Sequence, residues 1–286
     1  MVASDRAVLI RYLRDNEPRR GSGLLIGGQF VLTADHCANG ADHRVIVDGQ
    51  SLSAMVHVRS ESTAVDIAVL KVPQLALAKV QQIRCALVNR SIADEVKGCR
   101  ALGFPAWKNG VHGGPTLAQA GGYLPTAEGL NPEEDGGTGL LAFKITDPEP
   151  ATPTVPKGDL DSPRSQWAGM SGAVIITEDD LVLGVVRSHS LSEGTRSLTV
   201  TGLEKINQLP QPVAALFWSA LGVDTFADLP VLPANRVTDP TKRRLRRILE
   251  LEKEELIYRS AAEQLMIEVV RMEFLGPYGP KVSEPK

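Results

Sequence analysis

A serine in a glycine-rich turn is the first feature of this sequence that could do chemistry. Ser171 lies in the pentapeptide Gly169-Met-Ser-Gly-Ala173, which follows a loop and precedes a β-branched run. Such a turn can present a hydroxyl to a carbonyl carbon while backbone N–H groups face the carbonyl oxygen, as an acyl-transfer nucleophile requires. An ordinary tight turn is the alternative interpretation of the same residues.

A histidine and an aspartate have the positions that such a nucleophile needs. His36 follows the β-rich run 30–33, at a turn that leaves a predicted strand. Asp66 interrupts the apolar run 64–72, which predicts a carboxylate at the mouth of a mostly buried strand. A buried carboxylate requires a partner such as an imidazole. The alternatives are an exposed loop histidine and a strand-entry turn residue.

The composition excludes several classes of protein. The 286 residues are 43% hydrophobic and 23% charged, with a formal net charge of −3, which is typical of a globular chain. No basic footprint predicts nucleic-acid binding, and no apolar run reaches the ~20 residues that cross a bilayer. Charges near the N-terminus argue against a signal peptide. We therefore expect a soluble cytoplasmic protein without membrane contact.

The cysteines are sparse and odd in number, at positions 37, 85 and 99. A disulfide framework usually needs more of them and an even number, so reduced thiols are expected. No pair has zinc-ligand spacing. We expect neither a metal nor a cofactor.

Short β-rich runs separated by glycine turns extend over about 200 residues. The runs 21–26 and 30–33 flank a glycine turn and predict a hairpin, whereas residues 5–14 fit either a strand or a short helix. Further strands are expected at 44–47, 52–58, 64–72, 99–105, 116–121, 140–145, 181–186 and 197–201. The pattern is typical of an all-β sandwich or a pair of barrels.

Three other segments differ from this pattern. Residues 147–165 contain five prolines and predict a loop that is functional or disordered. Residues 213–221 predict a helix that Gly222 ends. After linker prolines, a helix is expected from 238 to 274, with an apolar stripe and a basic run near its start that is either a solvated face or an interaction surface. We predict two domains, 1–222 and 223–286.

Three ordered motifs resemble those of the trypsin/chymotrypsin-like serine protease family. Val31-Leu-Thr-Ala-Asp-His-Cys37 is similar to its histidine motif, Val65-Asp-Ile-Ala-Val-Leu70 to its aspartate motif and Gly169-Met-Ser-Gly172 to its nucleophile motif. The interval of 30 residues from His36 to Asp66 is short, as in the bacterial HtrA-type branch. The resemblance covers about residues 5–222. It implies an all-β double β-barrel of the chymotrypsin type, here with a C-terminal α-helical extension.

The resemblance implies a serine endopeptidase with its site between two six-stranded barrels. Ser171 would attack the scissile carbonyl, His36 would take and return its proton, and Asp66 would orient the imidazole. The backbone N–H groups of Gly169 and Ser171 would form the oxyanion hole. The other histidines, at positions 43, 57, 112 and 189, match no motif and are expected to be surface or packing residues.

Four positions bear on activation and specificity. Met170 stands where secreted members carry the aspartate that pairs with a new N-terminus after zymogen cleavage, and Gly21 stands where the disulfide partner of Cys37 is expected. Ser165 would line the floor of the substrate pocket, which predicts a preference for uncharged side chains. Arg187 would restrict that pocket or bind a carboxylate.

We therefore expect an intracellular bacterial endopeptidase that cleaves protein substrates under the control of a partner or ligand. The helix 238–274 would bind a regulatory protein or a second copy of the chain. The alternative is a catalytically weak protease-fold scaffold or binding module in a bacterial stress or defence complex, which Met170 and Arg187 favour. Ester hydrolysis is a third possibility, because the acyl chemistry is the same.

Overall fold

The computed structural model divides the chain into two compact units, Met1–Pro233 and Ala234–Lys286. It describes residues 3–75, 80–91, 93–105, 108, 114–128, 139–147, 167–189, 196–233, 244–245, 247–249 and 259–275. Most of the predicted proline-rich loop 147–165 and the predicted helix start at Thr238 lie outside these residues. Short 3-10 helices span Ala3–Arg6, Pro73–Leu75, Leu203–Gln208 and Phe226–Asp228.

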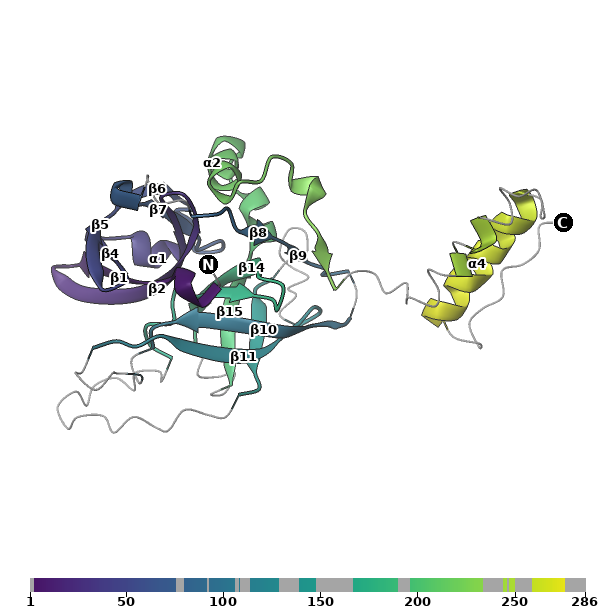
Figure 1. Cartoon of the computed structure of the whole chain (residues 1–286), viewed down its shortest axis with the longest axis horizontal. Helices are drawn as coiled ribbons and strands as arrows, with labels where there is room; N and C mark the ends of the chain where they lie inside the picture. The colour runs from purple at the N-terminus through teal and green to yellow at the C-terminus, as the bar shows by residue number, and fades with distance from the viewer. Residues whose placement is uncertain are drawn as a thin grey trace. The chain divides into compact units, whose positions relative to one another are not determined.

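The first unit begins with a seven-stranded antiparallel sheet, drawn in purple and blue in Figure 1. Its strand order is β5-β4-β1-β2-β3-β7-β6. The predicted hairpin is confirmed as β2 and β3, and the ambiguous run 5–14 is the strand β1. The bounds are β1 (Ala7–Arg14), β2 (Glu17–Gly27), β3 (Phe30–Thr33), β4 (Ala41–Val47), β5 (Gln50–Ser53), β6 (Met55–Arg59) and β7 (Ala68–Lys71).

A bend at Ala54 brings the two edges of this sheet together. The sequence predicts one strand over 52–58, but the structure divides it into β5, which pairs with β4, and β6, which pairs with β7. Between them the Ala54 N–H donates to the His43 carbonyl oxygen, 2.9 Å away. The edge strands are therefore joined through one residue, and the sheet curls around a core that includes Ile10, Leu24 and Leu32.

The second sheet of the first unit is a closed barrel. Its ring order is β13-β10-β11-β12-β15-β14, and an additional antiparallel pairing of β13 with β14 closes it. Phe143 and Leu183 are fully buried in its core. The bounds are β10 (Glu95–Gly103), β11 (Ala118–Pro125), β12 (Leu141–Ile145), β13 (Val174–Ile176), β14 (Leu181–Ser188) and β15 (Ser197–Gly202). The all-β class with two barrels, expected from the sequence, is confirmed.

Residues after the second barrel pack into the first unit. Helix α2 (Gln211–Leu221) ends as predicted, because Gly222 adopts a left-handed φ of 67°. Beyond it the Phe226 ring lies 5.3 Å from that of Trp218. The strand β16 (Val231–Leu232) pairs with β9 (Leu87–Val88), and β8 (Arg84–Cys85) pairs with β14. The segment 223–233, expected as a linker, thus has packed structure.

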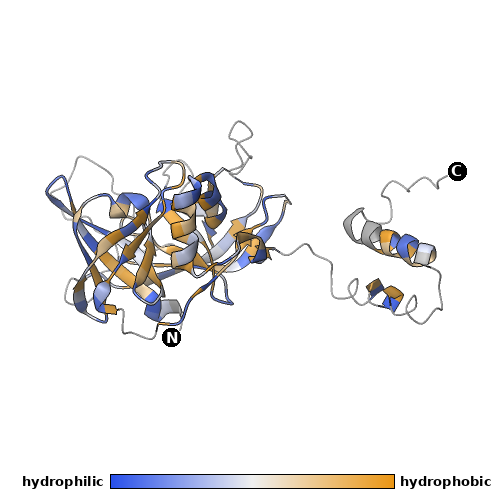
Figure 2. Cartoon of the chain, turned by 90° about the horizontal axis from the view of Figure 1, so that it is seen from above, coloured by the Kyte–Doolittle hydropathy of each residue, from blue (hydrophilic) through white to orange (hydrophobic). Residues whose placement is uncertain are grey.

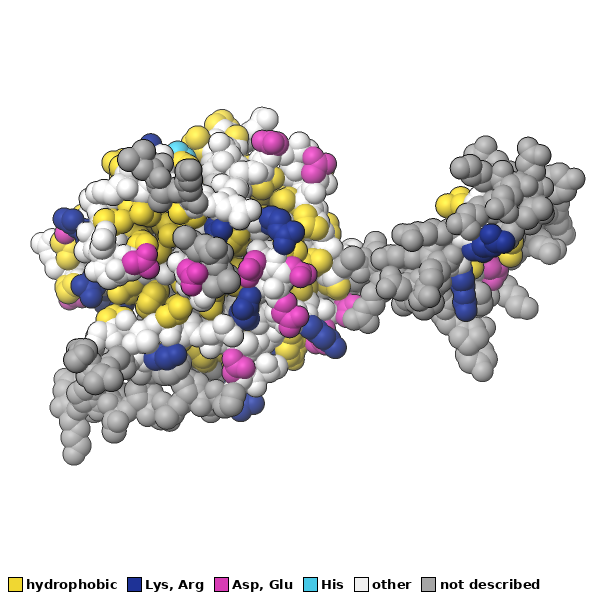
Figure 3. Space-filling view, viewed as in Figure 1, with side chains coloured by type: hydrophobic (Ala, Val, Ile, Leu, Met, Phe, Trp, Pro, Cys, Tyr) yellow, Lys and Arg dark blue, Asp and Glu magenta, His cyan; other side chains and the backbone are white. Residues whose placement is uncertain are grey.

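The second unit contains the helix α4 (Arg259–Leu275), preceded by helical residues at 244–245 and 247–249. Ala262 is fully buried, whereas Leu265 and Ile267 are exposed. Figure 2 shows mostly hydrophobic strands in the first unit and mixed hydropathy along α4. No helix among the described residues is long and apolar enough to span a membrane. On the face of the first unit in Figure 3, basic side chains are interspersed with acidic ones.

Gly21 of β2 lies directly against Cys37. A Cβ atom built at position 21 would be 2.6 Å from the Cys37 Sγ atom. The Cys37 thiol is buried and free. Position 21 is therefore where a disulfide partner of Cys37 would stand.

We predict that Gly21→Cys forms a disulfide with Cys37 under oxidising conditions. Bridged cysteines need Cβ atoms about 3.8 Å apart, which this geometry allows with a small shift. The bridge would close a loop of about 16 residues and stabilise the fold by about 3 kcal/mol. Non-reducing peptide mapping and the Tm with and without reductant measure both effects. The double variant Gly21→Cys/Cys37→Ala is the control, and two free thiols after oxidation would contradict the prediction.

Candidate active site

A single helical turn, α1 (Asp35–Ala38), carries His36 at the end of β3. The sequence predicts a turn there, and the structure forms one turn of helix. Its first residue, Asp35, is buried and accepts two hydrogen bonds from Arg59 of β6, Nε to Oδ1 at 3.0 Å and an Nη to Oδ2 at 2.9 Å. A bidentate pair of this kind fixes both partners in orientation. It anchors α1, and with it His36, to the neighbouring strand.

Asp66 precedes β7 in a conformation that is uncommon for any residue except glycine. Its φ is +45°, and its N–H donates to the Ser62 carbonyl oxygen at 2.9 Å. Only 8% of its side chain is exposed. The carboxylate accepts from His36 Nδ1, 2.9 Å from Oδ2, and from the His36 backbone N–H, 2.9 Å from Oδ1. The buried carboxylate therefore has an imidazole as its partner.

This pairing determines the protonation of His36. Burial lowers the pKa of the imidazole, but the hydrogen bond to Asp66 and further contacts with Cys37 outweigh it and raise the pKa to about 10. The charged imidazolium is therefore the favoured form at neutral pH. In that form both ring nitrogens carry protons, so neither can accept one from a hydroxyl.

Ser171 occupies a turn that only glycines can make. Gly169 and Gly172 have φ values of +95° and +85°. A Cβ atom at Gly172 would lie 2.1 Å from the Ser22 carbonyl oxygen, so the close approach also requires glycine. The turn is closed by hydrogen bonds from Met170 N–H to the Trp167 oxygen and from Ala173 N–H to the Met170 oxygen, at 2.9 and 2.8 Å.

His36, Asp66 and Ser171 line one pocket of about 690 Å³, together with Arg187. The Ser171 hydroxyl donates to the Arg187 carbonyl oxygen at 3.2 Å. Among the described contacts, Ser171 and His36 share no hydrogen bond. The structure thus connects His36 and Asp66 by a hydrogen bond. Ser171 lies in the same pocket, but its hydroxyl is bonded to Arg187 of β14.

The amide groups predicted to bind an oxyanion lie in the same turn. Within the described part of the chain, the N–H groups of Gly169 and Ser171 donate to no other backbone group. By contrast, the neighbouring amides of Met170, Gly172 and Ala173 all have backbone acceptors. Among the backbone groups that the structure describes, these two amides therefore have no acceptor, whereas their neighbours in the turn do.

The positions that depart from the family pattern have different surroundings. Met170 is 1% exposed and packs in the core of the second barrel. Arg187 extends toward Asp66, with its Nε 3.8 Å from Asp66 Oδ2. Ser165 lies outside the described residues, so the preference for uncharged substrate side chains stays a prediction.

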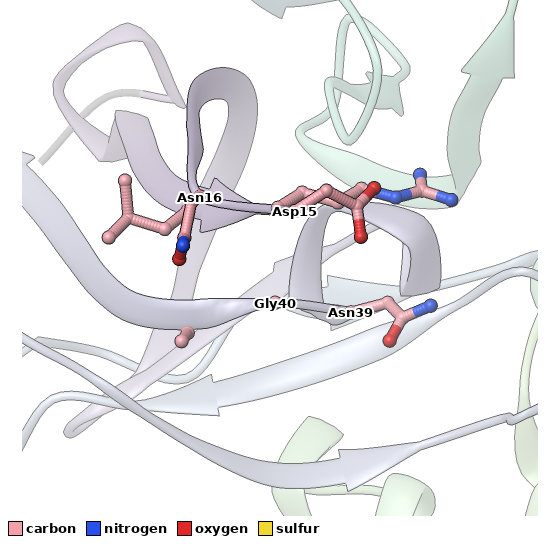
Figure 4. Close-up of a pocket in the computed structure, with 7 residues that line it drawn as sticks. Asp15, Asn16, Asn39 and Gly40 are labelled. Carbon is pink, nitrogen blue, oxygen red and sulfur yellow. The ribbon is translucent and has the colours of Figure 1, made fainter.

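A second pocket, of about 530 Å³, adjoins the first. Asp15 and Asn16 at the turn between β1 and β2, and Asn39 and Gly40 after α1, border it (Figure 4). Arg14 and Asn39 also line the pocket of His36 and Ser171.

Two of the other histidines, His43 and His57, do not line the pocket of His36 and Ser171. His43 is buried and stacks on Tyr12, with ring centroids 6.0 Å apart, and burial lowers its pKa. The His57 ring lies 4.7 Å from that of Phe30. Position 112 lies outside the described residues. No group of three or more potential metal ligands occurs in the part of the chain that the structure describes.

Sequence reasoning missed Ser22 of β2. This fully buried serine donates its N–H to the Ser171 oxygen and its hydroxyl to the Gly169 oxygen, both at 2.7 Å. Its hydroxyl also accepts from the Phe104 N–H at 2.9 Å. In the sequence, the only indication of this role is that a polar residue stands within Gly21-Ser-Gly23, at the start of an otherwise apolar run.

No protein-family model and no curated protein sequence matches the chain. Solved structures do match. The active form of the Rv3671c protease from M. tuberculosis aligns with a TM-score of 0.51 at 18% identity, over 78% of this chain and 83% of that one. The inactive form of the Rv3671c protease aligns with a TM-score of 0.50 at 18% identity, over 74% and 90%.

A variant of the HtrA-type protease AlgW, solved with a tripeptide, also aligns with a TM-score of 0.50 at 18% identity. The alignment covers 74% of this chain and 61% of the AlgW chain, so this chain spans less than two thirds of its length. At these identities the likeness is one of fold. The chain therefore has the chymotrypsin-like double-barrel fold of the HtrA-type, trypsin-like serine proteases.

Proposed function

We propose that the chain is a serine endopeptidase in which His36, Asp66 and Ser171 form the catalytic triad. The observation that carries this proposal is the pocket in which a histidine bound to a buried aspartate lies beside a serine on a glycine-dependent turn. Packing of the core alone would not require a histidine, an aspartate and a serine to line the same pocket. The fold shared with serine proteases supports the same reading.

The geometry suggests how the residues would act. The Ser171 hydroxyl would leave the Arg187 oxygen, donate to a neutral His36 and attack the scissile carbonyl carbon. The amides of Gly169 and Ser171 would stabilise the oxyanion of the tetrahedral intermediate. His36, held by Asp66, would then protonate the leaving amine, and a water molecule would release the acyl group by the same path.

The arrangement supports a regulated enzyme. Because Ser171 is bonded to the Arg187 oxygen and the pKa of His36 is raised to about 10, catalysis would need the hydroxyl to rotate and the imidazole to lose a proton. We propose that a partner or ligand promotes this change, in a bacterial cytoplasm where the three buried thiols stay reduced. The exposed Leu265 and Ile267 of α4 would bind a regulatory protein or a second copy of the chain.

A catalytically weak scaffold is the second candidate function. It is favoured by Arg187, whose carbonyl oxygen holds the nucleophile and whose guanidinium lies near Asp66. If no condition releases Ser171, the pocket would bind peptides without cleaving them.

Labelling by a fluorophosphonate tests the nucleophile. We expect covalent labelling of the wild-type chain, alone or after addition of cell lysate, and none of Ser171→Ala. Asp66→Asn should slow labelling about 10³- to 10⁴-fold, because the imidazole loses the group that sets its tautomer. Ser188→Ala, which alters another serine of the pocket lining, should still label. Failure of the wild type to label with or without lysate would favour the scaffold.

The pH dependence of labelling tests the base. Only neutral His36 accepts the serine proton, and its pKa is raised to about 10, so the rate should keep rising above about pH 8. Asp66→Asn removes the anion that retains the proton, and should move the rise to lower pH while reducing the plateau. Labelling rates from pH 6 to about 10.5, with circular dichroism to verify folding, measure this. A plateau already reached below about pH 7 would contradict the assigned protonation.

A further inference from the structure

We propose that Ser22 is a positioning residue for the nucleophile turn, which it fixes on both sides of Ser171. The inference rests on the proposed function for its catalytic consequence, but its structural content can be tested separately. Ser22 belongs to β2 of the first sheet. Three of its hydrogen-bond partners, the Gly169 oxygen, the Ser171 oxygen and the Phe104 N–H, belong to chain segments of the second barrel.

The contacts use nearly every hydrogen-bonding group that Ser22 has. Its N–H donates to the Ser171 oxygen and its hydroxyl donates to the Gly169 oxygen, each at 2.7 Å, while the hydroxyl accepts from the Phe104 N–H at 2.9 Å. Its own carbonyl oxygen accepts from the Thr33 hydroxyl at 2.7 Å. Because Ser22 is fully buried, water cannot replace any of these partners.

Two of these bonds control the orientation of a third peptide. Peptide units are planar, so holding the Gly169 oxygen fixes the plane that links Gly169 to Met170, and holding the Ser171 oxygen fixes the plane that links Ser171 to Gly172. The peptide between these planes carries the Ser171 N–H, a proposed oxyanion donor. The same peptide is also held through its Met170 oxygen, which accepts from the Ala173 N–H at 2.8 Å. Ser22 therefore helps to fix where the Ser171 N–H points by holding the peptides on either side of it.

Glycine makes this control necessary. Gly169 and Gly172 can adopt φ values of either sign, so their own backbones add no conformational restraint to the hydrogen bonds of the turn. The hydroxyl of Ser22 supplies one from outside the turn. An alanine at position 22 would keep the backbone bond to Ser171, but it would release the Gly169 oxygen and leave the part-buried Phe104 N–H without this acceptor.

A purely structural role would predict a different result, and Thr126 offers a matched comparison. Its hydroxyl is also fully buried, accepts from the Asp94 N–H at 2.8 Å and donates to the Asp94 oxygen at 2.9 Å. Thr126 does not line the pocket of His36 and Ser171. Thr126→Val therefore removes the same two kinds of hydrogen bond at a place where they cannot orient the nucleophile turn.

The experiment compares full-length wild type, Ser22→Ala and Thr126→Val at a temperature where all three are folded. Fluorophosphonate labelling of Ser171 gives a limiting rate and a half-saturating concentration, and amide hydrogen exchange reports on residues 167–173. For Ser22→Ala we expect a limiting rate about 10- to 100-fold lower, an unchanged half-saturating concentration and faster exchange of the turn. Thr126→Val should change neither the rate nor that exchange.

Two results would overturn the proposal. One is a wild-type rate with wild-type exchange in Ser22→Ala, and the other is equal slowing in Thr126→Val, which would mean general destabilisation. If the wild type itself does not label, the proposed function fails, and exchange of 167–173 alone decides on Ser22. If Ser22→Ala does not fold, Ser22→Cys replaces it, because a thiol is a weaker donor and acceptor of similar shape and should give a smaller slowing.

Discussion

The contact between the two barrels sets the geometry on which the pocket depends. His36 and Asp66 belong to segments of the first sheet, whereas Ser171 belongs to the turn that enters the second barrel, so no local interaction fixes the distance between them. Contacts between the two sheets fix this distance. Ser22 donates hydrogen bonds to the carbonyl oxygens of Gly169 and Ser171, and the Cys37 thiol lies 3.6 Å from the Ser171 oxygen. Cys37, which follows His36, and Ser22 of the neighbouring strand β2 thus contact the same turn, so the backbone of the first sheet links His36 to the turn of Ser171.

A chain of charges forms the other half of the site. The Asp66 carboxylate is shared between the His36 imidazole at 2.9 Å and the Arg187 guanidinium at 3.8 Å. Because Asp66 and Cys37 together raise the pKa of His36 from 6.5 to about 10, these contacts stabilise the fold fully below about pH 6.5, and their contribution is lost as the pH rises through 10. The protonation that favours the fold is thus the one in which neither ring nitrogen can accept a proton.

Local chemistry explains how much the sequence could reveal. The turn at Ser171 was predictable because the left-handed φ values of Gly169 and Gly172 demand glycine, and strand formation followed from β-branched runs. The bend at Ala54 could not be predicted, because it depends on the pairing of β5 with β4 and of β6 with β7, at opposite ends of the sheet. The contacts of Ser22 span 82 and 147 residues along the chain, so no local pattern encodes them.

Met170 shows what replaces an ion pair in this turn. At 1% exposure its side chain lies in the core of the second barrel, and a Cβ atom at Gly103 would come within 2.7 Å of its sulfur. The turn is therefore held from one side by apolar burial and from the other by the hydroxyl of Ser22, neither of which depends on a charge created by cleavage. What remains variable in the pocket is the proton of His36 and the hydrogen bond from Ser171 to the Arg187 oxygen. Both lie at the pocket surface, where a bound peptide or partner could reach them.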